Sequence, residues 1–166
     1  MSDVDPARRA YVALGSNLGD SRRSVLEAMD ALAALADTCV LGRSPLYRTA
    51  AWGITEQPPF VNAVTLLETR LAPHALLDAM LTMERAAGRV RDGVRWGPRT
   101  LDLDLLYMEG VQLNDARLTL PHPRIAERAF VLLPLHDLAP DLHLPGQGRV
   151  GELLARLDLA DCEVLP

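Results

Sequence analysis

The stretch Arg95-Trp96-Gly97-Pro98-Arg99-Thr100-Leu101-Asp102-Leu103-Asp104 joins an arginine-rich loop to a strand that carries two carboxylates. From Leu101 onward the chain alternates Leu and Asp, which is the period of a strand with one buried face. Asp102 and Asp104 therefore share one face of this strand, and the leucines share the other. Two residues along a strand span about 6–7 Å, so both carboxylates can reach one divalent ion or a closely spaced pair.

Four arginines precede this strand, namely Arg89, Arg91, Arg95 and Arg99, and residues 89–99 contain only one acid, Asp92. Arginine neutralises phosphate oxygens and carboxylates ligate Mg²⁺, so this order of residues fits a polyanion bridged by a metal ion. An isolated Asp-x-Asp pair is more often a solvated strand face, and the arginines could then be ordinary surface charge. The dense arginines and the stiff Trp-Gly-Pro segment favour the phosphate site.

The composition is that of an ordinary globular protein, with 166 residues, 49% hydrophobic and 23% charged. This length predicts a single domain over residues 1–166. A net charge of −5 argues against a general nucleic-acid binder. All 17 basic residues are arginine, which excludes a Walker-type lysine and a lysine Schiff base. Phosphate binding must therefore rely on arginine, backbone amides and metal.

The expected compartment is the cytoplasm. The chain has no apolar run of membrane-spanning length, and its first residues lack a signal-peptide core. Cys39 and Cys162 are the only cysteines and lie far apart in the sequence, which is typical of a reducing environment. We expect no membrane partner.

The apolar periodicity predicts an α+β fold with a ferredoxin-like β-α-β-β-α-β core and a C-terminal helical extension. The expected strands are residues 10–14, 39–49, 60–69 and 101–108. Two helices are expected to begin at Asp20 or Ser21 and at Pro73. A third should span residues 126–138, with Pro134 kinking or breaking it. Residues 1–9 are expected to form a disordered arm and residues 145–166 a peripheral tail.

Phe60 and Asn62 fall on the same face of the third predicted strand. An aromatic ring beside an amide suits a flat heterocycle that forms hydrogen bonds. A core phenylalanine next to a satisfied asparagine is the commoner explanation, and the residues alone leave both open.

At the level of motifs the chain resembles the 6-hydroxymethyl-7,8-dihydropterin pyrophosphokinases of folate biosynthesis. The resemblance rests on residues 13–19 (Ala-Leu-Gly-Ser-Asn-Leu-Gly), 60–63 (Phe-Val-Asn-Ala), 95–104, and 120–123 (Leu-Pro-His-Pro) followed by Glu127, Arg128 and Phe130. These separate motifs occur in one order and cover about residues 11–142, which is far more specific than an Asp-x-Asp pair.

The resemblance implies a ferredoxin-like monomeric enzyme that transfers the terminal diphosphate of ATP to the hydroxymethyl group of the pterin and releases AMP. Asp102 and Asp104 would ligate two Mg²⁺ ions, and the catalytic Arg89 and Arg91 would lie on a loop that closes over the phosphates. The implied ATP-binding residues are Glu84, Arg91, Arg95, Trp96, Arg99, Leu105, Arg117, Thr119, His122 and Arg128. The implied pterin-binding residues are Thr49, Trp52, Phe60, Asn62, Asp102 and Phe130.

Two other classes of protein share parts of this pattern. A two-metal nucleotidyltransferase or nuclease would use the same Asp-x-Asp logic, together with a third carboxylate near the pair. An RNA-binding module on a ferredoxin-like sheet would need a basic face with alternating aromatics, and both the net charge and the scarcity of aromatic residues speak against it.

Overall fold

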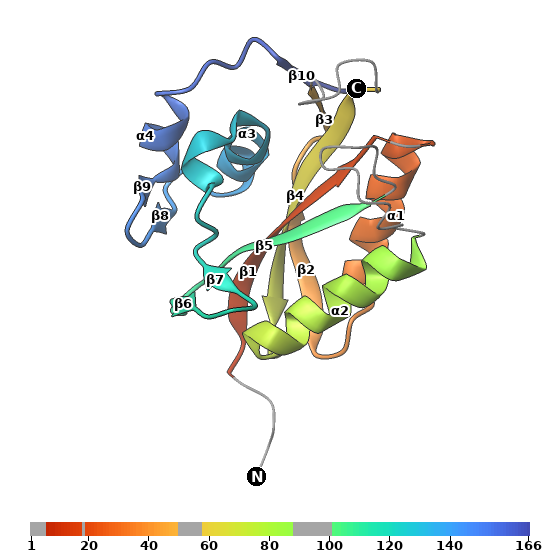
Figure 1. The fold of residues 1–166 in the computed structure, drawn as a ribbon, viewed down its shortest axis with the longest axis vertical. Coiled ribbons are helices and arrows are strands. Elements are labelled where there is room, and N and C mark those ends of the chain that lie inside the picture. The colour runs from red at the N-terminus through yellow and green to blue at the C-terminus, as the bar shows by residue number, and fades with distance from the viewer. Residues whose placement is uncertain (1–5, 18, 50–57, 88–100) are drawn as a thin grey trace.

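The centre of the fold is an antiparallel sheet, seen in a computed structural model that describes residues 6–17, 19–49, 58–87 and 101–166 (Figure 1). Its strands are β1 (Arg8–Ser16), β2 (Thr38–Arg43), β3 (Tyr47–Thr49), β4 (Phe60–Thr69), β5 (Asp102–Met108) and β10 (Cys162–Val164). They lie in the order β10-β3-β4-β1-β5, and β2 pairs with β4 beyond β3.

Helices cover both faces of this sheet, as Figure 1 shows. On one side are α1 (Ser21–Ala33) and α2 (Pro73–Ala86), and on the other are α3 (Ala129–Leu138) and α4 (Val150–Leu154). The connection β1-α1-β2/β3-β4-α2-β5 confirms the predicted ferredoxin-like arrangement. Each face has its own apolar cluster, one around Val12, Leu67 and Met80 and one around Val64, Leu132 and Leu135.

The first two helices begin where their sequence signals predict. The Asp20 carboxylate accepts a hydrogen bond from the Arg23 backbone N–H at 3.1 Å and so caps α1. Pro73 is the first residue of α2, a position whose N–H has no acceptor within the helix, so proline loses no hydrogen bond there. The apolar stripe of each helix then packs on the sheet.

The strand predicted over residues 39–49 is in fact two strands, β2 and β3. Ser44 separates them: its backbone N–H donates to the Val64 carbonyl at 2.9 Å, and its Oγ accepts from the Val64 N–H at 2.9 Å. A side-chain oxygen thus takes the place of a backbone carbonyl in the ladder. The register against β4 shifts across this point, so pairing continues only from Tyr47.

Three other predicted boundaries also need correction. β1 begins at Arg8, which pairs with Thr69, so residues 8 and 9 do not belong to a disordered arm. A 3₁₀ turn over Ile125–Glu127 precedes α3, and Pro134 lies buried inside α3 without breaking it. The region 145–166 is less peripheral than predicted, because α4 buries Val150 and β10 joins the main sheet.

Short hairpins complete the fold. β6 (Leu113–Asn114) pairs with β7 (Thr119–Leu120), and β8 (His143–Leu144) pairs with β9 (Gly148–Arg149). Within the described ranges, no helix has the length and apolar character needed to cross a bilayer.

Candidate active site

The two aspartates lie half-buried on one face of β5, as the alternating sequence predicts. In the sheet register Asp102 is opposite Gly15 and Asp104 is opposite Ala13. The leucines at 101, 103 and 105 are buried in the cluster beneath α1 and α2. The carboxylates therefore face the α3 side of the sheet. Further along β5 a bulge at Leu106 ends the strict alternation, and both Leu106 and Tyr107 join the second cluster.

Glu84 supports β5 from the opposite side. Its side chain is 3% exposed, and Oε2 accepts a hydrogen bond from the Leu103 backbone N–H at 2.8 Å. Leu103 lies between the two aspartates, so this contact fixes the backbone that sets their spacing. Sequence similarity implies a place for Glu84 around ATP, whereas the contact seen here is with the protein backbone.

The residues expected around the pterin line up across the neighbouring strands. Asn62 on β4 is opposite Gly15 on β1, and Thr49 on β3 is opposite Phe60 on β4. The Asn62 amide Nδ2 donates to Thr49 Oγ1 at 2.6 Å, and both side chains are buried. This bond fixes which way the Asn62 amide points.

Gly15 forms a gap in the middle of this row. A Cβ atom at position 15 would lie 2.8 Å from Asn62 Oδ1 and 3.9 Å from the Phe60 ring. Because Gly15 is also opposite Asp102, the gap lies between the amide and the first aspartate. Between Asn62 and Asp102 this face of the sheet therefore carries no side chain.

Arg128 and Phe130 reach this face from the start of α3. Arg128 Nη1 lies 3.9 Å from Asp104 Oδ2, and its guanidinium carbon is 5.7 Å from the centre of the Phe130 ring. A cation beside the second aspartate and an aromatic ring over the same face fit an anionic group next to a flat ring.

His122 is tied to β5 by its backbone. Its N–H donates to the Leu106 carbonyl at 2.7 Å, and its Nδ1 accepts from the Arg124 N–H at 3.2 Å. Burial, with the nearby guanidinium groups of Arg128 and Arg124, lowers the pKa of His122 to about 4. The imidazole is therefore neutral near pH 7.

Three other residues expected around ATP, Arg117, Thr119 and Leu105, have side chains that contact other parts of the protein. Arg117 forms an exposed ion pair with Asp78 on α2, and Thr119 Oγ1 donates to Asn114 Oδ1 at 3.3 Å within the β6–β7 hairpin. The Leu105 side chain is buried on the opposite face of β5, so only its backbone is left to contact a nucleotide on the aspartate side. The remaining predicted residues, Arg89, Arg91, Arg95, Trp96, Arg99 and Trp52, lie outside the described residues.

Two residues of the motif over residues 13–19, Gly15 and Asn17, are not among the site residues predicted from the sequence. Asn17 Nδ2 donates to the Pro58 carbonyl at 3.1 Å and so joins the end of β1 to the segment that leads into β4. The Gly-Ser-Asn run was a usable signal, but its contacts involve residues remote in the sequence.

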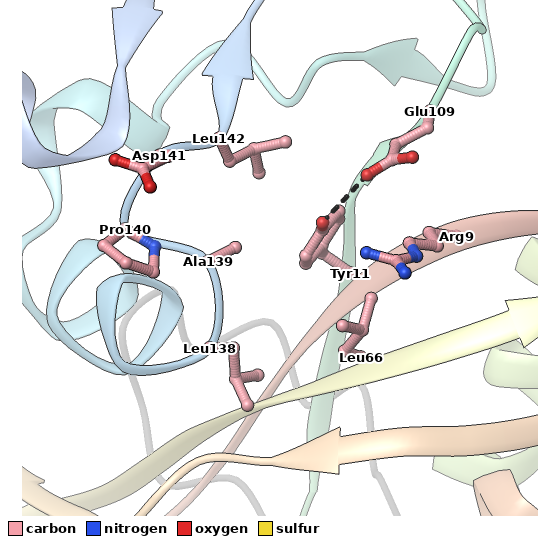
Figure 2. A pocket seen from close by; sticks show the side chains of 9 residues that line it. All are labelled: Arg9, Tyr11, Leu66, Glu109, Leu138, Ala139, Pro140, Asp141 and Leu142. Atoms are coloured by element: carbon pink, nitrogen blue, oxygen red, sulfur yellow. Dashed lines mark hydrogen bonds between the residues drawn. The ribbon is translucent and has the colours of Figure 1, made fainter.

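A separate hollow of about 270 Å³ lies on the same face of the sheet near the start of β1 (Figure 2). Arg9, Tyr11 and Glu109 line one side, and the Tyr11 hydroxyl donates to Glu109 Oε1 at 3.0 Å. Its other side is formed by residues 138–142, at the end of α3 and just beyond it. None of its lining residues belongs to the candidate site.

The fold and these residues together define a class: a ferredoxin-like enzyme that brings a carboxylate pair and an adjoining cation next to a glycine and a buried asparagine amide. Residues 11–140 match the family model described as 7,8-dihydro-6-hydroxymethylpterin-pyrophosphokinase. The chain belongs to this family, and it is an ATP-dependent diphosphotransferase of folate biosynthesis.

Individual relatives agree over nearly the whole chain. The protein is 49% identical over 155 residues to the 2-amino-4-hydroxy-6-hydroxymethyldihydropteridine pyrophosphokinase of Methylorubrum extorquens, covering 93% of this chain and 97% of that one. It is 50% identical over 159 residues to the enzyme of the same name from Pseudomonas aeruginosa, covering 96% and 98%.

A solved structure supports the fold. The chain resembles the crystal structure of Plasmodium falciparum HPPK-DHPS with pteroate, with a TM-score of 0.74 at 14% identity. The match covers 94% of this chain but only 43% of that one. At this identity the likeness shows the fold alone.

Proposed function

We propose that this enzyme transfers the terminal diphosphate of ATP to the hydroxymethyl group of 6-hydroxymethyl-7,8-dihydropterin and releases AMP. One observation carries the proposal. Asp102, the first of the paired carboxylates, and Asn62, the amide beside Phe60, are both opposite Gly15 in the sheet. A metal-bound polyphosphate and a flat acceptor would therefore meet on one surface.

The donor set fits magnesium. Mg²⁺ takes oxygen ligands and usually keeps several waters, so it is bound by one or two carboxylates together with substrate phosphates. Asp102 and Asp104 are half-buried on one face, and the Asp104 side chain is 39% exposed, which leaves access for water and phosphate oxygens. We propose that they hold two Mg²⁺ ions. When bound, these ions would neutralise the phosphates and the developing charge on the leaving AMP.

The protein side chains would then perform the positioning that phosphoryl transfer requires. Asn62 and Thr49 would orient the polar edge of the pterin, and Phe60 and Phe130 would stack on its faces. Arg128, next to Asp104, would contact the phosphates, and His122 and Thr119 would lie around ATP.

We also propose roles for residues whose placement rests on family similarity. Asp102 is the candidate to accept the proton of the attacking hydroxyl group. Arg89 and Arg91, with Arg95 and Arg99, would neutralise the transferring diphosphate as the preceding loop closes. Closure would exclude water, which competes with the pterin as acceptor.

The enzyme would work as a cytoplasmic monomer without nucleic-acid or membrane partners. The net charge of −5 and the free thiols of Cys39 and Cys162 support this part of the proposal. Light scattering coupled to size-exclusion chromatography would test it, with a single species of 18.1 kDa expected.

Product analysis tests the proposed reaction. The protein is mixed with ATP, Mg²⁺ and 6-hydroxymethyl-7,8-dihydropterin, and the nucleotides are separated by chromatography. AMP that forms only when both pterin and metal are present is the expected result. ADP instead of AMP would mean that a single γ-phosphoryl group is transferred, and the proposed placement of the triphosphate would be wrong.

The nucleotidyltransferase or nuclease alternative gains no support from the geometry. Such a site would need a third carboxylate near the pair, and among the residues placed here no three His, Cys, Asp or Glu side chains form a metal-binding group. Glu84, the carboxylate that contacts β5, is directed to the Leu103 amide instead.

A further inference from the structure

The last strand of the chain, β10, closes the sheet beside the slot proposed for the pterin. It runs antiparallel to β3, with Cys162 opposite Thr49, Glu163 opposite Arg48 and Val164 opposite Tyr47 (Figure 1). These residues lie well beyond the segment 11–140 that matches the family model. The family-model match therefore does not extend to β10.

β3 is a short strand that needs support on both edges. It has three residues, and only Tyr47 to Thr49 pair with β4. Such a short pairing is weak by itself, because few ladder hydrogen bonds form. Within the described residues, β3 is further held by the Tyr47 hydroxyl, which donates to Asp137 of α3, and by β10 along its outer edge.

The hydrogen-bond pattern of the β10–β3 pair follows from one observed bond. The Leu165 N–H donates to the Leu46 carbonyl at 2.8 Å, so these residues form a hydrogen-bonded pair one step beyond the strand. Hydrogen-bonded and non-hydrogen-bonded pairs alternate in antiparallel sheets. The backbone of Glu163 thus bonds to that of Arg48, and the Val164 N–H points away from β3.

The same alternation makes Cys162 and Thr49 a non-hydrogen-bonded pair, whose side chains are the closer ones. Thr49 is 4% exposed and its Oγ1 accepts from Asn62 at 2.6 Å. Strand pairing and one side-chain hydrogen bond therefore connect β10, through Thr49, to the amide that would bind the pterin.

We infer that β10 is a positioning element for the acceptor substrate: by holding β3 it fixes Thr49, and through Thr49 it fixes the orientation of the Asn62 amide. The inference rests on the proposed pterin reaction. The aspartates would be unaffected, since β5 lies at the opposite edge of the sheet, with β4 and β1 between it and β3. Loosening β10 should weaken use of the pterin without weakening use of ATP.

Two neighbouring proline substitutions test this inference. Glu163→Pro removes the N–H that bonds to β3, whereas Val164→Pro removes an N–H that points away from β3, and among the described strands β10 is the last on that side, where proline is tolerated. We expect Glu163→Pro to raise the KM for the pterin roughly tenfold, with the KM for ATP unchanged. Val164→Pro should resemble the wild type in both constants.

The outcomes separate the inference from the proposed reaction. Wild-type protein that makes no AMP from ATP and the pterin would overturn the reaction itself. Active wild type with equal pterin KM values for both proline variants would overturn only the role of β10, as would a parallel rise in the KM for ATP. A simple loss of fold in Glu163→Pro would show as a lowered Tm.

Hydrogen exchange on the wild-type enzyme tests whether pterin binding stabilises β10, without the need for a variant. We expect 6-hydroxymethyl-7,8-dihydropterin, added without ATP, to slow exchange of the Glu163 and Leu165 amides together with those of β3. ATP and Mg²⁺ added without the pterin should not. Protection confined to β4, with β10 unchanged, would contradict the inference.

Discussion

Asp102 and Asp104 project from the same face of β5, while the leucines around them are buried on the other. Replacing either aspartate with Asn keeps the size and removes the charge that a metal–phosphate complex would need. We predict that Asp102→Asn and Asp104→Asn each lower kcat by at least about a hundredfold, with a nearly unchanged Tm. Asp141→Asn, at the exposed rim of the separate hollow, is the matched control. Near wild-type turnover in either site variant would contradict the assigned roles.

Gly15 leaves room for the Asn62 amide, which a Cβ would approach to 2.8 Å. Asn62 cannot easily turn away, because its Nδ2 is bound to Thr49. We predict that Gly15→Ala raises the KM for the pterin by roughly tenfold or more, while the KM for ATP stays within about twofold. Steady-state kinetics with each substrate varied in turn measures both constants.

Gly151→Ala in α4 serves as the control for this substitution, since the nearest atom to its added Cβ would be 3.4 Å away. Alanine is also the better helix former there. An unchanged pterin KM in Gly15→Ala would show that the absence of a side chain at position 15 does not matter for pterin binding.

Glu84 connects two elements, since it extends from α2 to the backbone of β5. Glu84→Ala leaves the Leu103 N–H buried without this acceptor, which costs about 1–3 kcal/mol, whereas the Glu84→Gln side chain still presents an oxygen. We predict a lower unfolding free energy and a weaker Mg²⁺ dependence of ATP binding for Glu84→Ala, with Glu84→Gln closer to the wild type. Urea unfolding and calorimetric titration with ATP measure the two effects. If Glu84→Gln lost as much of the Mg²⁺ dependence of ATP binding as Glu84→Ala, the charge of the carboxylate would matter more than its hydrogen bond to Leu103.

At the scale of elements, prediction from the sequence succeeded where one local signal dominates. β4 spans the predicted residues 60–69 because its β-rich run is unbroken, and α2 starts at Pro73 because proline favours the first helical turn. It failed between β2 and β3, where Ser44 replaces a backbone acceptor opposite Val64. The hydrogen bond of the Ser44 hydroxyl depends on Val64, which is distant in the sequence, so no local pattern predicts the break between the two strands.

The same distinction applies to the candidate site. The shared face of Asp102 and Asp104 followed from the two-residue period alone. The need for glycine at position 15 could not be predicted in this way, because it depends on where Asn62 lies on the adjacent strand. The pairing of residues 162–164 with residues 47–49 could not be predicted either, because neither segment alone indicates its partner.

For the whole molecule, His122 makes the stability of the ligand-free protein depend on pH. Its pKa falls from the ordinary 6.5 to about 4 on folding, so between these values the unfolded chain binds a proton that the folded one does not. The unfolding free energy therefore decreases as the pH falls from 6.5 to 4 and is fully retained above 6.5.

His122→Gln should remove this part of the pH dependence. We predict that the unfolding free energy of the wild type, minus that of His122→Gln, falls by on the order of 2 kcal/mol between pH 6.5 and pH 4. Urea unfolding curves at several pH values measure it. A difference that stays constant over this range would mean that His122 does not titrate as described.

In the proposed function the two substrates bind toward opposite edges of the sheet. The polyphosphate of ATP would lie at β5 and the pterin on the side of β4 and β3. In the proposed reaction, the hydroxyl of the acceptor attacks the β-phosphorus, and the oxygen that bridges the α- and β-phosphorus atoms departs with AMP. Attack at the α-phosphorus, as in a nucleotidyltransferase, would leave that oxygen in the diphosphate product.

The most direct test therefore uses ATP labelled with ¹⁸O at the α,β-bridging position, incubated with the enzyme, Mg²⁺ and 6-hydroxymethyl-7,8-dihydropterin. Mass spectrometry of the products locates the label. The account predicts labelled AMP and an unlabelled pterin diphosphate. Unlabelled AMP, or a pterin–AMP adduct with labelled diphosphate, would contradict it.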